Sequence, residues 1–149
     1  TAEIAVMGAE GAAEIVFRSG VKITQMPLDV THRALVTRPR LDAFAAMGTR
    51  TGTFTAEMLD FFERFDIEKY GSEGGPLHDP TTIAYLLRPE LFTGRFINVE
   101  VETGSELTRG MTVADWWGVT DRTANAMFMG DIDADGFFAL LTERLARLP

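Results

Sequence analysis

The sequence contains no cysteine and carries no excess of positive charge. Without thiols it has neither a disulfide framework nor a thiol nucleophile. Its formal net charge of −8 argues against a surface that binds nucleic acid or an anionic membrane. The chain also lacks an apolar run of membrane-spanning length and the basic-then-apolar start of a signal peptide. These absences favour a cytoplasmic protein that has neither nucleic acid nor a membrane as a partner.

The composition is that of one ordinary globular domain. The chain has 149 residues, and 46% of them are hydrophobic. This is enough for a core that buries roughly two thirds of the surface of the unfolded chain. No repeat, linker or low-complexity tract divides the sequence.

Apolar residues recur with helical spacing in some segments and alternate with polar residues in others. We expect helices over residues 10–19, 38–47, 55–69, 80–87 and from 137 onward, and strands over 1–6, 21–26, 97–101 and 126–129. A turn at 103–105 should join the strand at 97–101 to an antiparallel partner within 107–117. The order predicts an α/β fold with an antiparallel hairpin late in the chain.

The expected helix over 55–69 carries a stripe of aromatic residues. We assign this stripe to the core and the charged positions, Glu63 among them, to the solvated face. A polar loop is expected over residues 49–53, before the helix.

A loop rich in glycine leads directly into an apolar helix over residues 74–87, Gly-Gly-Pro-Leu-His-Asp-Pro-Thr-Thr-Ile-Ala-Tyr-Leu-Leu. Asp79 occupies the expected N-cap position and Pro80 the first helical position. The His78 imidazole and the Asp79 carboxylate therefore lie side by side where a helix presents its free N–H groups. From the residues alone, Asp79 is either only a helix cap beside a loop histidine, or part of a functional site with His78.

The segment 74–87, with Pro-Glu-Leu-Phe at 89–92, resembles the C-terminal signature of the inosine-uridine type nucleoside hydrolases. Further stretches agree with the family in the same order, at 12–20, 27–32, 112–116 and 137–145. The resemblance covers essentially the whole chain but only the second half of such an enzyme. It implies a nucleoside-hydrolase-like α/β fold, an open and mostly parallel sheet with flanking helices. Residues 1–149 would be the C-terminal portion of that domain, without its aspartate-rich N-terminal half.

The resemblance also implies roles for individual residues. Members of the family cleave the N-glycosidic bond of nucleosides and hold a Ca²⁺ ion that binds the ribose diol and a water nucleophile. Asp79 aligns with a calcium ligand, and His78 with a histidine proposed to help the base depart, a task that suits an imidazole near neutral pH. Tyr70 lies where some pyrimidine-preferring members place a tyrosine against the base, although a half-buried wall residue is an equal alternative. Glu3 aligns with an acid that holds the 5′ hydroxyl of the sugar.

The sequence departs from the family pattern in the residues that hold the sugar. Ala5 stands where the family has an asparagine, and Ala9-Glu10 stands where it has Asp-Pro. His32 is a candidate for a second acid-base residue. We interpret it as structural, because the family has no acid-base residue at this position.

The family's aspartate cluster, which supplies most of the calcium ligands, belongs to the missing half, and Ca²⁺ requires six to eight oxygen ligands. Two hypotheses follow. The chain is part of a calcium-dependent nucleoside hydrolase that pairs with an N-terminal half or self-associates, or it is a catalytically inactive remnant or interaction module.

Residues 131–136 have the acids and the glycine of the start of an EF-hand loop. The twelfth position is Thr142, which cannot provide the bidentate carboxylate of such a loop. We therefore predict a helix N-cap with acids in the first turn, where they suit the helix dipole.

Overall fold

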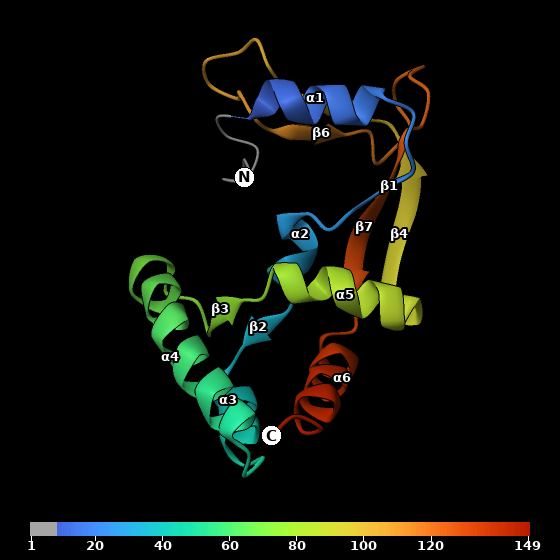
Figure 1. Ribbon diagram of the computed structural model, residues 1–149. Coiled ribbons are helices and arrows are strands. Elements are labelled where there is room, and N and C mark those ends of the chain that lie inside the picture. The colour runs from blue at the N-terminus through green and yellow to red at the C-terminus, as the bar shows by residue number, and fades with distance from the viewer. Residues whose placement is uncertain (1–8) are drawn as a thin grey trace. The chain divides into compact units, whose positions relative to one another are not determined.

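The computed structural model describes residues 9–149, apart from the side chains of Phe65, Asp66 and Tyr70. The strand expected over residues 1–6, and with it Glu3, lies outside the described residues. The chain forms two compact units (Figure 1). The first unit comprises Thr1–Leu28 and Thr93–Gly130, and the second comprises Asp29–Phe92 and Asp131–Pro149.

The first unit is built on a three-stranded sheet in the order β1, β7, β4. β1 (Ile23–Gln25) pairs in parallel with β7 (Ala126–Ile132), whereas β4 (Phe92–Ile97) runs in the opposite direction (Figure 1). Gly94 permits the close approach of β4, because a Cβ atom there would lie 2.6 Å from the carbonyl oxygen of Phe128. The sheet is therefore mixed, as an α/β fold with an antiparallel component requires.

A second, two-stranded sheet confirms the late hairpin. β5 (Val99–Val101) pairs antiparallel with β6 (Thr112–Ala114). α1 (Glu10–Arg18) packs against β5. The two valines of β5 are buried and the glutamate between them is half-buried, which is the alternation expected of a strand with one face in the core.

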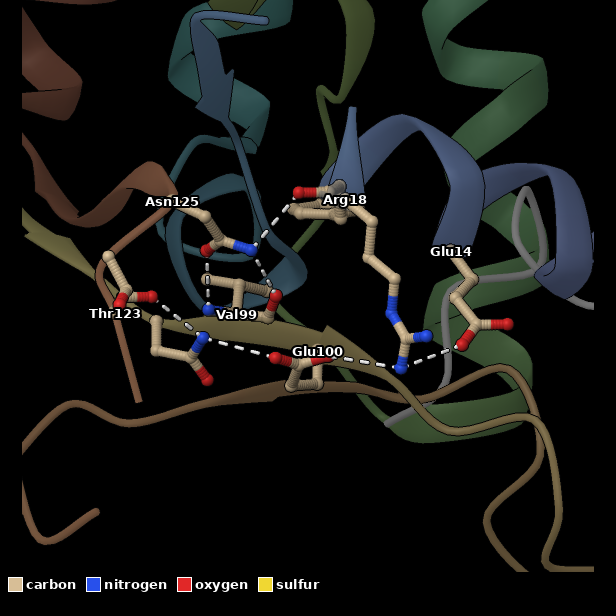
Figure 2. A network of polar contacts seen from close by, with 8 residues as sticks. Glu14, Arg18, Val99, Glu100, Thr123 and Asn125 are labelled. Carbon is tan, nitrogen blue, oxygen red and sulfur yellow. Dashed lines mark hydrogen bonds and ion pairs between the residues drawn. The ribbon is translucent and has the colours of Figure 1, made fainter. Parts of the chain in front are cut away.

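The Asn125 side chain takes the place of a neighbouring strand beside β5. Its Oδ1 accepts a hydrogen bond from the Val99 N–H at 2.8 Å, and its Nδ2 donates to the carbonyl oxygens of Val99 at 2.9 Å and Phe17 at 3.2 Å (Figure 2). The partly buried amide thus satisfies three backbone groups that have no ladder partner. Near it, the exposed Arg18 forms an ion pair with Glu14 at 2.9 Å (Figure 2).

The second unit is mainly helical. Its core contains fully buried aromatic and aliphatic side chains, among them Phe44 and Phe137. Its elements are α2 (Leu28–Thr31), β2 (Leu35–Val36), α3 (Arg38–Ala45), α4 (Arg50–Tyr70), β3 (Gly75–Pro76), α5 (Asp79–Leu87), η1 (Pro89–Leu91) and α6 (Ala134–Leu145). α3 packs against α4, and α6 packs against α3 and α5.

α4 differs from its prediction in its start and in the face that it buries. It begins at Arg50 because the Thr49 side chain accepts a hydrogen bond from the Gly52 N–H at 3.0 Å, so the expected polar loop over 49–53 is wrong. The helix buries Leu59 and Glu63, whereas the described aromatic residues of the stripe are exposed. The assignments of the stripe to the core and of Glu63 to the solvated face are therefore wrong for this chain.

The start of α6 confirms the interpretation of residues 131–136. Asp133 is the N-cap, and its Oδ1 accepts a hydrogen bond from the Gly136 N–H at 3.0 Å. Asp135 lies in the first turn of the helix.

Among the helices of the described residues, none is long and apolar enough to cross a membrane.

Candidate functional site

The residues before α5 are held by the short antiparallel pair β2–β3. Val36 aligns with Gly75, and the Leu77 N–H donates to the Ala34 carbonyl oxygen at 3.0 Å. A Cβ atom at Gly75 would lie 3.1 Å from Cα of Glu63, a contact tighter than backbones normally allow. The glycines of this segment are buried and serve close packing, so the expected loop before α5 contains the short strand β3 at Gly75–Pro76.

The start of α5 lies one residue earlier than predicted. His78 occupies the N-cap position and Asp79 is the first helical residue. The turn begins at His78 because its carbonyl oxygen accepts hydrogen bonds from the Thr81 N–H at 3.2 Å and the Thr81 hydroxyl at 2.6 Å. The Asp79 side chain is exposed, and none of the side chains or backbone groups that the structure describes donates a hydrogen bond to its carboxylate. Asp79 is therefore not a hydrogen-bonding cap, and its charge faces solvent at the positive end of the helix.

The His78 side chain lies beside the end of α2. Its Nδ1 is 2.9 Å from the hydroxyl oxygen of Thr31, a residue that is only 1% exposed. The ring of His32 lies next to it, with 5.8 Å between the ring centroids and 51° between the planes. His78 itself is half-buried. Two segments that are far apart in the sequence therefore meet at this imidazole.

Only some of the predicted site residues lie within the described part of the site. His78 and Asp79 lie together at the start of α5, while Tyr70 is the last residue of α4 and its side chain is not described. Glu3 is outside the described residues. The sequence reasoning did not find Thr31, although it lies in the stretch at 27–32 that carries the resemblance. The only signal was the position of Thr31 within that stretch.

The residues present do not provide a complete metal site. In the part of the chain that the structure describes, no three His, Cys, Asp or Glu side chains are grouped so that they could hold an ion. Ca²⁺ needs six to eight oxygen ligands, and Asp79 can provide at most two of them. The described residues therefore do not fit a calcium ion by themselves, and Asp79 stays a prediction for one ligand.

Glu63 packs against the loop that enters α5, and its carboxyl group has a raised pKa because it is buried. Glu63 is 7% exposed, and its Oε2 has no hydrogen-bond partner among the described residues. Burial of the carboxyl group raises the pKa of Glu63, and the negative charge of Asp60 adds to the effect. The hydrogen bond from Arg64, at 2.7 Å, instead lowers the pKa of Asp60. Glu63 therefore opposes folding whenever it must be ionised.

Comparison with known proteins identifies the family. The family model of the inosine-uridine preferring nucleoside hydrolases matches residues 1–139. The pyrimidine-specific ribonucleoside hydrolase RihA of Enterobacter sp. is 51% identical over 137 residues, which are 91% of this chain and 44% of the relative. An uncharacterized protein of Schizosaccharomyces pombe is 46% identical over 138 residues, which are 93% of this chain and 44% of that protein. The chain belongs to the inosine-uridine preferring nucleoside hydrolase family.

The comparison of structures agrees with the comparison of sequences. The purine-preferring ribonucleoside hydrolase from Gardnerella vaginalis superposes with a TM-score of 0.78 and 31% identity, over 92% of this chain and 43% of that one. The resemblance found in the sequence and the predicted α/β fold are thus confirmed. The chain spans less than half the length of the relatives that it matches.

Proposed function

We propose that the chain takes part in hydrolysis of the N-glycosidic bond of ribonucleosides to ribose and free base, as part of a calcium-dependent nucleoside hydrolase. The observation that carries this proposal is the start of α5 in a chain that matches the family over residues 1–139. There, an imidazole with a fixed partner adjoins a carboxylate that faces solvent. These are the groups that a metal-assisted glycoside hydrolysis requires.

His78 acts as the general acid for the departing base. Cleavage of the bond between the sugar and the base produces an oxocarbenium-like sugar and leaves negative charge on the base. A proton from the imidazole neutralises that charge, and a histidine can provide it near neutral pH. This step is worth roughly 10²- to 10⁴-fold in rate when the leaving group is poor.

Asp79 contributes one carboxylate to a calcium ion whose other ligands come from outside the described residues. The exposed position of its carboxylate at a helix start supports this proposal. We expect the isolated chain to bind Ca²⁺ only weakly or not at all, because a single carboxylate does not complete the coordination sphere. Calorimetry with Ca²⁺ measures this. Micromolar binding that is lost in Asp79→Ala would reveal a second set of ligands in this chain.

Pyrimidine nucleosides are the substrates that the comparisons favour. The relative with 51% identity is named a pyrimidine-specific ribonucleoside hydrolase, whereas the purine-preferring one has 31% identity. Tyr70, at the end of α4, is proposed to contact the base, and Glu3 the 5′ hydroxyl of the sugar. The preference is tested in the fusion enzyme described below. A higher kcat/KM for inosine than for uridine and cytidine would contradict it.

A partner must cover the apolar residues that α4 and α5 expose. Phe61 of α4 and Leu86 of α5 are each 75% exposed, and similar neighbours flank both. Apolar groups exposed in such number mark a surface that another part of a protein covers. We propose that the remaining half of a nucleoside hydrolase domain covers them, and that the isolated chain self-associates through them.

A second candidate is a catalytically inactive remnant of the family that serves as an interaction module. Ala5 favours it, because alanine cannot hydrogen-bond the sugar through its side chain as the family's asparagine does.

A fusion enzyme decides between the two candidates. In this fusion, the present chain replaces the part of Enterobacter RihA that it matches, and the rest of RihA is kept. Calcium-dependent hydrolysis of uridine that is lost in Asp79→Ala is the expected result. A fusion that folds, as judged by circular dichroism and a cooperative unfolding transition, but does not turn over any nucleoside would favour the inactive module.

A further inference from the structure

The Thr31 hydroxyl is in contact with the catalytic imidazole proposed above. Its oxygen lies 2.9 Å from Nδ1 of His78, and the two residues are 47 positions apart in the sequence. Thr31 is 1% exposed, so water does not compete for this hydrogen bond. The contact therefore belongs to the interior of the second unit.

Backbone hydrogen bonds fix both residues of the pair. The Thr31 carbonyl oxygen accepts from the Ala34 N–H at 3.0 Å, and the Ala34 carbonyl oxygen accepts from the Leu77 N–H at 3.0 Å. On the other side, the two bonds from Thr81 hold the carbonyl oxygen of His78. The bond between Leu77 and Ala34 thus joins the two segments beside the contact, and the bonds from Thr81 fix the turn that carries His78.

The burial of Thr31 decides which group donates in this hydrogen bond. A hydroxyl can donate or accept, and a neutral imidazole carries its proton on one ring nitrogen only. Among the described residues, the Thr31 hydroxyl has no acceptor other than Nδ1 of His78. If Nδ1 carried the proton, the buried hydroxyl proton would have no partner, and an unpaired buried donor is unfavourable. The hydroxyl therefore donates to Nδ1, and the imidazole proton resides on Nε2.

We propose that Thr31 is a positioning residue that keeps neutral His78 in the Nε2–H tautomer and fixes the direction of its ring. This inference rests on the proposed function, because an Nε2–H group is the donor that His78 needs as the general acid. Thr31 itself transfers no proton to the substrate. Its hydroxyl determines which ring nitrogen can do so, as partners of other functional histidines do.

The chain offers a direct spectroscopic test because it contains two histidines. A long-range ¹H–¹⁵N spectrum at about pH 8.5, roughly two units above the usual imidazole pKa, reports which ring nitrogen carries the proton. His32 is exposed and its ring has no hydrogen bond to another described residue, so this ring, although it lies beside that of His78, serves as the internal reference for a tautomer that no hydrogen bond fixes. The variant His32→Gln assigns the two sets of signals.

We expect the Nε2–H tautomer alone for His78 in the wild-type chain and an average of both tautomers for His32. Thr31→Val, which removes the hydroxyl at nearly constant shape, should move His78 toward the average, and Thr31→Ser should restore it. Thr82→Val is the matched control, since the Thr82 hydroxyl bonds the Asp79 carbonyl oxygen at 2.7 Å and should leave both sets of signals unchanged.

Two results would overturn the proposal. One is a wild-type His78 that carries its proton on Nδ1 or averages like His32, and this result decides the question even if Thr31→Val does not fold. The other is a folded Thr31→Val chain, judged by its amide spectrum, in which His78 keeps the Nε2–H tautomer.

The fusion enzyme separates this inference from the proposed function. There, Thr31→Val should lower kcat for uridine by roughly tenfold or more, with Thr31→Ser close to wild type. A folded fusion that has no activity at all would refute the proposed function, while the tautomer of His78 would still be measured in the isolated chain. An active fusion in which Thr31→Val changes the tautomer but not kcat would refute the catalytic purpose of the contact.

Discussion

A Cβ atom at position 74 would lie 2.0 Å from the carbonyl oxygen of Val36. No side chain fits into that space, so β2 can approach the segment before β3 only if residue 74 is glycine. This approach joins the end of the segment that contains Thr31 to the start of the segment that contains His78. The glycine is thus part of what positions the candidate site.

We predict that Gly74→Ala lowers the free energy of unfolding by about 1–3 kcal/mol, because β2 must move away from the added methyl group. Gly104→Ala is the control, since a Cβ atom there would meet only the Glu102 side chain, at 3.5 Å. Urea unfolding followed by circular dichroism measures both variants. Equal stability of the two would show that the segments are not as close as the structure has them.

Asn125 should be important for the stability of the first unit. In Asn125→Asp the carboxylate cannot donate to the carbonyl oxygens of Val99 and Phe17, so we expect a loss of about 1–3 kcal/mol in the free energy of unfolding. Arg18→Ala removes the ion pairs of the exposed Arg18 side chain with Glu14 and Glu100 and should cost no more than about 0.5 kcal/mol. Urea titrations at neutral pH compare the two. A larger loss in Arg18→Ala would mean that the amide does not replace a strand.

The raised pKa of Glu63 predicts that the stability of the chain falls as the pH rises through this pKa. Burial raises the pKa of Glu63 in the folded chain above 4.5, so the folded state binds its proton more tightly than the unfolded state. The stability from this group is complete below pH 4.5 and is lost as the pH rises through the folded pKa. Glu63→Gln, which cannot ionise, should therefore be more stable than wild type at pH 7, with a smaller difference at pH 4.

Unfolding free energies at both pH values test this prediction. The control is Glu57→Gln, an exposed position on the same helix for which we expect no such difference. A Glu63→Gln chain that is less stable than wild type at pH 7 would indicate that the ionised carboxylate has a favourable partner.

The exposed apolar residues of α4 and α5 predict association of the isolated chain. In sedimentation velocity at increasing concentration we expect species larger than a monomer, which Phe61→Asp and Leu86→Asp each reduce. Leu107→Asp is the control, because Leu107 is 93% exposed but lies in neither helix. A strictly monomeric wild-type chain would contradict the proposal that these residues need a partner.

The helices in which apolar residues recur with helical spacing could be predicted from the sequence, and so could the hairpin. α1, α6 and the pair β5–β6 all follow from local patterns of apolar residues, capping residues and glycine. Local patterns determine these elements, so one sequence suffices to predict them. The resemblance to the family added the fold and the roles expected of His78 and Asp79.

Contacts between distant segments could not be predicted in this way. The prediction of the buried face of α4 was wrong. The amphipathic pattern does not show which face of the helix the rest of this chain covers, and Glu63 is buried despite its charge. Thr31 was missed because a threonine in a short helix has no pattern that indicates a contact 47 residues away. The start of α5 differed by one residue because Thr81 bonds the carbonyl oxygen of His78, which moves the first turn.

The central claim is that His78 protonates the leaving base and Asp79 helps to hold the metal, and two substrates in the fusion enzyme test it most directly. His78→Ala should slow uridine hydrolysis by roughly 10²-fold or more but barely affect a nitrophenyl riboside, whose leaving group departs without a proton. Asp79→Ala should slow both, because the metal positions the sugar and activates water whatever the leaving group is. Equal losses on the two substrates in His78→Ala would contradict the role of His78 as the general acid.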